Sequence, residues 1–128
     1  MFGNLFNNKI NLNLLIFSIS LLIIDQFSKA MIVSQFDLYE SISVAPFFNF
    51  TFVVNYGFAF GFLNSPSLNQ IIVSLVILSI IIYFLYLLIK TQDRVFKICL
   101  VLILSGALGN FLDRIFRGYV VDFIDIYV

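Results

Sequence analysis

Residues 71–89, IIVSLVILSIIIYFLYLLI, form an uncharged apolar run in the middle of the chain. A helix of about 20 residues crosses a hydrocarbon layer about 30 Å thick, so this run predicts a membrane-spanning helix. A shorter uncharged run covers Ile98–Leu112, and another covers Leu12–Ile24 near the start of the chain. The run at Leu12–Ile24 can cross only if its helix continues towards Val33. We therefore predict three transmembrane helices.

The composition also indicates an integral membrane protein. Of 128 residues, 62% are hydrophobic and 11% are charged, whereas a soluble domain is about half apolar and about a quarter charged. So small a soluble core could not bury this excess, which excludes a soluble enzyme. The net charge is zero, so we expect no nucleic-acid partner. With no His and a single Cys, we expect no metal and no cofactor, and any proton chemistry must use Asp, Glu, Lys or Tyr.

The distribution of Lys and Arg predicts the orientation in the membrane. The short segment Lys90–Lys97 carries three cations, whereas the long connection Ser34–Gln70 carries none. Short loops rich in Lys and Arg stay in the cytoplasm. The connection therefore lies outside, and the third helix runs outward so that its carboxyl end reaches the outer face.

The outer connection predicts a small folded element. Apolar and polar residues alternate over Phe48–Phe52, which is typical of a strand with one wet face. In Asn55–Phe62, Gly or Ala residues stand between aromatic residues. The backbone N–H and C=O groups of such a segment need hydrogen-bond partners, so it cannot lie open in lipid. Pro66 ends this segment before the second helix. We predict an all-α integral membrane protein, one domain over residues 1–128, with a small β/loop cradle between its first and second helices.

Charged residues in or near a span are functional candidates by default. Asp25 and Lys29 are spaced i, i+4 and share a helix face. They form either an interfacial ion pair that lets the helix reach the surface or a site whose floor is Asp25. Both interpretations stay open at this point.

The third helix carries a stripe of small and polar residues. Ser105 and Gly109 form a small-xxx-small pair that lets another helix approach closely. The stripe itself consists of Gly106, Asn110, Asp113, Arg114 and Arg117. An isolated Asp113–Arg114 would be a helix-end ion pair, but an Asn one turn earlier favours a buried polar site.

After the third helix the chain returns to the membrane surface. Gly118 ends the helix, and an apolar stretch brings Asp122 back to the membrane surface, where it is either a carboxylate on a re-entrant or interfacial turn or part of a site. Its apolar neighbours, Val120, Val121, Phe123 and Ile124, hold its carboxyl group at a low-dielectric boundary. Asp122 is therefore a candidate for acid–base chemistry.

At these residues the chain resembles the lipoprotein signal peptidases, the type II signal peptidases of bacteria. Four motifs match in the family's order, from about Leu12 onward. They are Asp25–Lys29 (DQFSK), Asn55–Gly61 (NYGFAFG), Gly106–Arg114 (GALGNFLDR) and Gly118–Phe123 (GYVVDF).

The resemblance implies a membrane-embedded aspartic endopeptidase of the bacterial inner (cytoplasmic) membrane, with its site near the extracytoplasmic face. Such enzymes remove signal peptides from diacylglyceryl-modified prolipoproteins by cutting before the lipidated Cys. It also implies membrane lipid as a neighbour and a monomeric protein. Asp122 matches one aspartate of the catalytic dyad. Substrate-binding or site-lining roles are implied for Asn55, Gly57, Asn110 and Arg114, and supporting roles for Asp25, Lys29 and Asp113.

One family motif is not in the sequence. The second dyad aspartate belongs to a Phe-Asn-x-Ala-Asp motif at the start of a fourth helix. We therefore expect a C-terminally incomplete fragment or an inactive product, and no cleavage by the 128 residues alone, because one carboxyl group cannot act as base and acid together. Asp125 lies too close to Asp122 to replace it. Without the fourth helix, we expect the small-residue face of the third helix to lack a partner.

Two other functions fit parts of the pattern. An ion- or proton-coupled membrane protein would relay protons through Asp25, Asn110 and Asp113, but it predicts polar residues throughout the membrane depth. Here they cluster at the outer ends of the helices. A non-catalytic assembly protein would use the small-residue face, but it would not need Asp122.

Overall fold

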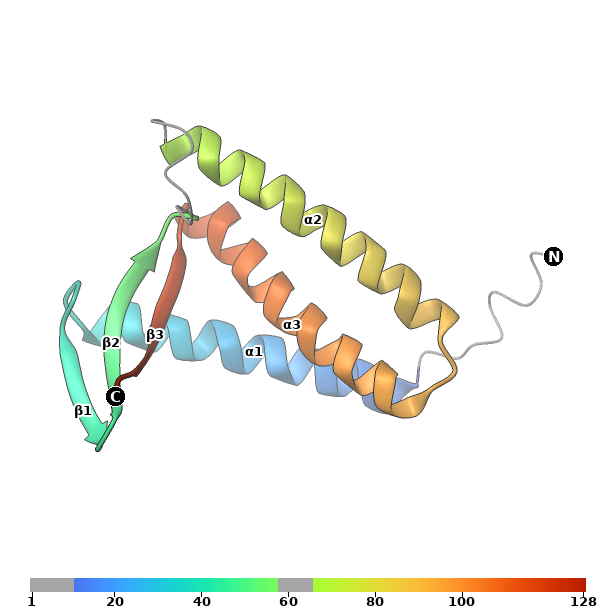
Figure 1. Ribbon diagram of the computed structural model, residues 1–128, viewed down its shortest axis with the longest axis horizontal. Coiled ribbons are helices and arrows are strands. Elements are labelled where there is room, and N and C mark those ends of the chain that lie inside the picture. Colours follow the sequence, from blue (N-terminus) through green and yellow to red (C-terminus); the bar gives the residue numbers. More distant parts are fainter. Residues whose placement is uncertain (1–10, 58–65) are drawn as a thin grey trace.

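A computed structural model describes residues 11–57 and 66–128 of the protein. Three long helices and a three-stranded sheet make up the fold (Figure 1). In chain order the elements are α1 (Leu12–Gln35), β1 (Ser41–Ala45), β2 (Phe48–Asn55), α2 (Pro66–Lys90), α3 (Arg94–Arg117) and β3 (Val120–Ile126). Part of the Asn55–Phe62 segment falls outside the described residues.

All three helices are long and apolar enough to cross a membrane, which confirms the three predicted spans. The third is longer than its uncharged run, because polar caps and charged ends extend it. The side chain of Asp93 accepts a hydrogen bond from the backbone N–H of Phe96 at its start. Gly118, with φ of 78°, ends it in the left-handed region that favours glycine. The charged residues that follow Leu112 therefore belong to the last turns of α3.

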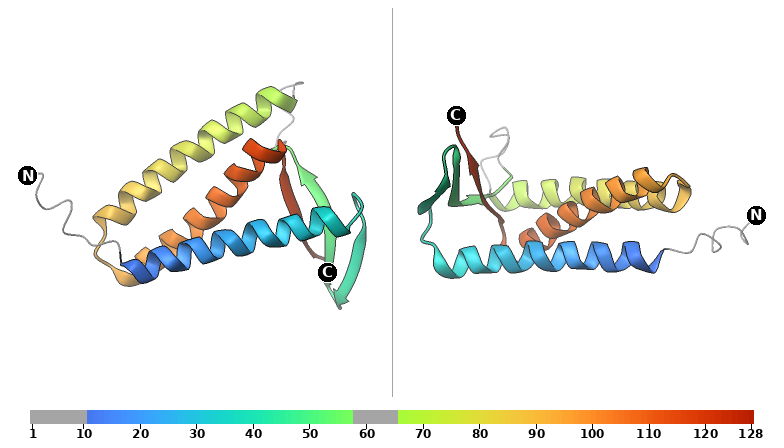
Figure 2. Two further views of the ribbon diagram at one scale, coloured as in Figure 1. Left: turned by 180° about the vertical axis from the view of Figure 1, so that it is seen from behind. Right: turned by 90° about the horizontal axis from the view of Figure 1, so that it is seen from below.

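The sheet lies at one end of the helices. Figure 1 and Figure 2 show it where α1 and α3 end and α2 begins, while the α2–α3 turn lies at the opposite end. Helix α3 packs against both α1 and α2. Most large apolar side chains of α2 are exposed, among them Ile71, Leu75 and Ile82. Such a face suits the hydrocarbon of a membrane rather than water.

The sheet is antiparallel, in the order β1-β2-β3. The predicted strand at Phe48–Phe52 is confirmed as part of β2. Residues 120–126 form strand β3, so the re-entrant or interfacial turn considered for Asp122 is not present. Phe50 pairs with Ile124 and Asn55 with Val120. This pairing satisfies the backbone of the returning chain at the membrane surface, where an open segment would leave its polar groups without partners.

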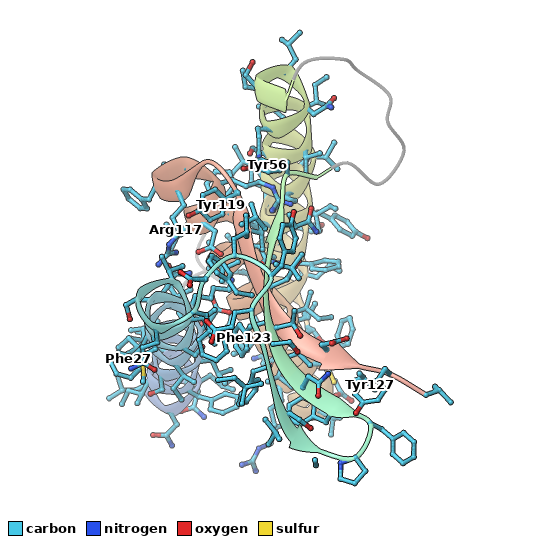
Figure 3. The ribbon with its side chains drawn as sticks, turned by 90° about the vertical axis from the view of Figure 1, so that its left-hand side faces the viewer. Phe27, Tyr56, Arg117, Tyr119, Phe123 and Tyr127 are labelled. Carbon is cyan, nitrogen blue, oxygen red and sulfur yellow. The ribbon has the colours of Figure 1, made fainter. Side chains whose placement is uncertain are left out.

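A small apolar cluster fastens the sheet to α1. Its buried members are Ile32, Phe52 and Val121, and Phe123 packs against them. Figure 3 shows Phe123 between α1 and the strands, whereas Phe27 points away on the outer side of α1. The cluster therefore fixes the position of Val121 on β3, and with it the position of the next residue, Asp122.

The small residues of α3 are packed against α1. The hydroxyl groups of Ser18 and Ser105 lie 3.1 Å apart. A Cβ atom added at Gly109 would collide with the carboxylate of Asp25, whereas one added at Gly106 would meet nothing within 4 Å. The expectation that this face lacks a partner is wrong, because the close approach that glycine permits is used by the first helix.

The two helix glycines give a matched prediction. We expect Gly109→Ala to destabilise the protein by about 1–3 kcal/mol, because its methyl group displaces a carboxylate held in an ion-pair network. Gly106→Ala fills open space and should leave stability unchanged or raise it by up to about 1 kcal/mol, since Ala is the better helix former. Thermal unfolding in detergent, followed by circular dichroism, measures both. Equal stability of the two variants would contradict the close α1–α3 contact.

Candidate functional site

Asp113 is the most deeply buried charged residue in the described part of the chain, with no exposed surface. Its Oδ2 atom lies 3.0 Å from Lys29 Nζ of α1 and accepts the backbone N–H of Val121 at 3.1 Å. Its Oδ1 atom pairs with Arg117 one helical turn later. One carboxylate thus joins α1, α3 and β3 directly beside Asp122.

Lys29 is the second centre of this network. Its side chain is 5% exposed, and Nζ lies 3.0 Å from Asp25 Oδ2. Nζ also donates to Asn110 Oδ1 at 3.0 Å. An ammonium group only donates, so this bond fixes the amide orientation of Asn110. Within the described residues no acceptor engages the Asn110 amide N–H groups, which leaves them available to a ligand.

Gln26 links the two carboxylates, a role that the sequence analysis missed. Its Nε2 atom lies within 3.0–3.1 Å of Asp25 Oδ2, Asp113 Oδ1 and the backbone oxygen of Gly109. Its Oε1 atom accepts from Arg117. The only available signal was its place next to Asp25, because apolar periodicity carries no information about a single amide.

The network is electrically balanced. Two carboxylates, Asp25 and Asp113, face two cations, Lys29 and Arg117. Burial of charge at the end of a membrane-spanning bundle is tolerated only when the charges are paired and hydrogen-bonded. The ion pair of Asp25 and Lys29, one of the two interpretations left open, is present and is one edge of a larger cluster, and Asp25 also lines the cavity beside this cluster.

A cavity of about 580 Å³ opens beside this network, between the sheet and the helices. Asp122 is exposed on β3 and lines it together with residues of α1, α3 and β2. The polar lining residues are Asp25, Lys29, Thr51, Asn110, Asp122 and Asp125. The cavity therefore combines an accessible carboxylate, Asp122, with a buried and rigid polar floor.

Asp125 has a different environment from Asp122, although both belong to β3. Its Oδ2 atom accepts from Thr51 Oγ1 at 3.0 Å and from Asn49 Nδ2 at 3.4 Å. Both carboxylates line the cavity, but within the described residues only that of Asp125 accepts hydrogen bonds from β2. The carboxylate of Asp125 is held by β2 and serves to join the strands.

Three predicted site-lining residues, Asn55, Gly57 and Arg114, lie away from this cavity. Arg114 lines a separate one beside Gln70 and Ser74 of α2 and donates to the Asn110 backbone oxygen at 3.2 Å. The alternative of a helix-end ion pair between Asp113 and Arg114 is not present, because the carboxylate pairs with Arg117, the residue one full turn away. The Asn55 side chain accepts the Gly57 backbone N–H at 2.7 Å. The cavity beside Asp122 therefore contains Asn110 and Asp122 but neither Asn55 nor Arg114.

Gly57 is placed by a strict steric requirement. Its φ is 82°, and a Cβ atom there would lie 3.1 Å from Val73 Cγ2 of α2. Glycine is the residue that meets both conditions without strain. Together with the Asn55 cap, this glycine turns the chain at the end of β2 towards α2.

Fold and site together define a class: a multi-pass helical membrane protein with a carboxylate-lined cavity under a small sheet at one membrane face. A family model described as signal peptidase (SPase) II matches residues 17–128. The chain belongs to this family, which confirms the resemblance drawn from four short motifs.

Relatives and solved structures agree. The chain is 42% identical over 110 residues to a lipoprotein signal peptidase of Alteromonas mediterranea, covering 83% of this chain and 60% of that enzyme. It is 40% identical over 125 residues to one of Haemophilus influenzae, covering 94% and 72%. The chain thus spans 60–72% of the length of these two relatives. A solved bacterial membrane enzyme superposes with a TM-score of 0.76 at 31% identity, covering 93% of this chain and 73% of that one.

Proposed function

We propose that this chain supplies most of the active site of a lipoprotein signal peptidase. Its substrate is a prolipoprotein that carries diacylglycerol on a Cys, and the bond that breaks is the peptide bond just before that Cys. The protein acts as a monomer in the bacterial inner membrane. The observation that carries the proposal is the exposed carboxylate of Asp122 beside the buried Lys29–Asp113 network, in a chain of this family.

Asp122 is one member of an aspartic dyad in this proposal. In such a pair one carboxylate takes a proton from water, and the water attacks the peptide carbonyl carbon. The protonated partner donates a hydrogen bond to the carbonyl oxygen and later returns a proton to the leaving amine. By family resemblance the partner is the aspartate of the Phe-Asn-x-Ala-Asp motif, which the 128 residues do not contain.

The remaining site residues position the substrate and the dyad. The amide N–H groups of Asn110, oriented by Lys29, are donors for a peptide carbonyl of the substrate. Asp113 holds the backbone of Val121 and so fixes the neighbouring Asp122. Incubating the chain, completed by the C-terminal segment of a relative, in detergent with a diacylglyceryl-modified prolipoprotein tests the activity directly, with mass spectrometry of the products to locate the cut. Cleavage elsewhere than before the lipidated Cys would refute it.

The proposed orientation places the sheet and the cavity outside the cytoplasm. It rests on the three cations of Lys90–Lys97 and on the absence of Lys and Arg from Ser34–Gln70. The structure supports it with the sheet and the α2–α3 turn at opposite ends of the helices (Figure 1).

Cysteine labelling gives the corresponding prediction. In a Cys99→Ser background, an impermeant thiol reagent added to spheroplasts should label Ser41→Cys and should not label Thr91→Cys until the membrane is permeabilised. Both positions lie in connections between spans, Ser41 at the start of β1 and Thr91 just after α2. The reverse pattern would overturn the orientation.

A further inference from the structure

A second cavity, unrelated to the carboxylate site, lies at the opposite end of the helices. Its volume is about 300 Å³, and it is bounded by the start of α1, the end of α2 and the first half of α3. Its walls are apolar, with Leu85 and Leu88 from α2 facing Leu104 and Leu108 from α3. It therefore provides a hydrocarbon-lined channel running from the α2–α3 end towards the middle of the bundle.

The mouth of this channel is polar and cationic. A neighbouring cavity of about 430 Å³ shares Asn11, Leu14 and Lys97 with it and adds Arg94 and Gln92. Among the described residues, neither Lys97 nor Arg94 forms an ion pair with a carboxylate. The two cavities adjoin at these shared residues, with Lys97 lining both, Arg94 in the more polar one and the leucine side chains in the apolar one.

We infer that this double cavity binds an anionic phospholipid. The headgroup phosphate lies against Lys97 and Arg94, and one acyl chain enters the apolar channel. Basic pockets between transmembrane helices are a recognised form of anionic-lipid site. The channel alone would accept any lipid tail, but the two cations without carboxylate partners select for negative headgroup charge. The inference does not depend on peptidase activity, since none of these residues lines the carboxylate cavity.

Native mass spectrometry of the chain in detergent tests the headgroup preference. Titration with phosphatidylglycerol should give a bound-lipid peak at lower concentration than titration with phosphatidylcholine. Lys97→Gln should weaken phosphatidylglycerol binding about fivefold, the effect expected for one cation at an anionic lipid surface. Lys90→Gln is the matched control, because Lys90 is an exposed cation at the same membrane end that lines neither cavity. An equal loss in both variants would overturn the site.

A second pair of variants tests whether an acyl chain enters the apolar channel. Leu88→Phe narrows the channel and should weaken binding of the same lipid, whereas Leu87→Phe changes a half-buried leucine of α2 outside the cavity and should not. Inorganic phosphate should fail to displace the lipid, because the tail contributes to binding. Displacement by phosphate, or unchanged binding in Leu88→Phe, would reduce the site to a surface anion contact and refute the proposal. A dimer mass that excludes lipid would assign the cavity to a second copy instead.

Discussion

Asp122→Asn is expected to lower the cleavage rate of a diacylglyceryl-modified prolipoprotein by about 100- to 10,000-fold, the usual contribution of a positioned acid–base group. Asparagine has nearly the same shape but cannot take a proton from water. The substitution is to be made in a longer chain, in which the 128 residues are followed by a segment with the aspartate of the Phe-Asn-x-Ala-Asp motif. A chimera with the C-terminal segment of the Haemophilus influenzae relative provides one, since the two chains align over 94% of this sequence.

Two controls make this result specific. Asp125→Asn removes a carboxylate from the same strand, but that carboxylate bonds to Thr51 and Asn49, so most activity should remain. The 128 residues without the C-terminal segment should give no turnover, because Asp122 then lacks its acid partner. Membrane insertion of all variants is checked by fractionation. Unchanged activity of Asp122→Asn would remove Asp122 from the mechanism, and turnover by the 128 residues alone would remove the need for a second aspartate.

The spans and strand β2 were predictable because they depend on local patterns. The length of the uncharged run at residues 71–89 requires a crossing helix, and Gly118 ends α3 where a left-handed residue is needed. The alternation at Phe48–Phe52 likewise coincides with a strand, whose residue Phe52 packs with Ile32 and Val121. In each case the signal and the structure involve the same few residues.

Strand β3 was not predictable in this way. Its pairing partner β2 lies far away in the sequence, and Asn55 pairs with Val120 only after α2 and α3 have crossed between them. The apolar residues around Asp122 indicated only a return to the membrane surface, and no strand was predicted from them. What decides the conformation is the open edge of β2, which the local sequence does not encode.

The site was predictable by residue type but not by partner. Asp113, Asn110 and Asp25 were identified as polar residues in apolar surroundings, yet the pairing of Asp113 with Arg117 was not predicted. Helix geometry carried the missing signal, since residues four apart face each other and adjacent residues do not. The role of Gln26 depends on the approach of α1 to Gly109, a contact between helices that no local pattern reveals.

The second large effect is expected from Asp113→Asn, through stability rather than chemistry. Asp113 is fully buried and pairs with Lys29 and Arg117. Removing one partner of a buried charge pair costs about 3–5 kcal/mol, because the remaining charge is left uncompensated. Asp25→Asn should cost less, since the side chain of Asp25 is 30% exposed and water can solvate the cation beside it. Thermal unfolding in detergent compares the two, and a larger loss for Asp25→Asn would contradict the central role of Asp113.

A double substitution separates charge balance from shape. Asp113→Asn leaves Lys29, Arg117 and Asp25 with a net positive charge, and adding Lys29→Gln restores neutrality. We therefore expect Lys29→Gln to cost markedly less in the Asp113→Asn background than in the unmodified protein, with a coupling free energy of about 0.5–3 kcal/mol. Arg94→Gln, at the far end of α3, serves as the uncoupled control and should add independently. Additive costs for Lys29 and Asp113 would mean that the network is held by packing and hydrogen bonds alone, and that its balanced charge does not stabilise the membrane-embedded site.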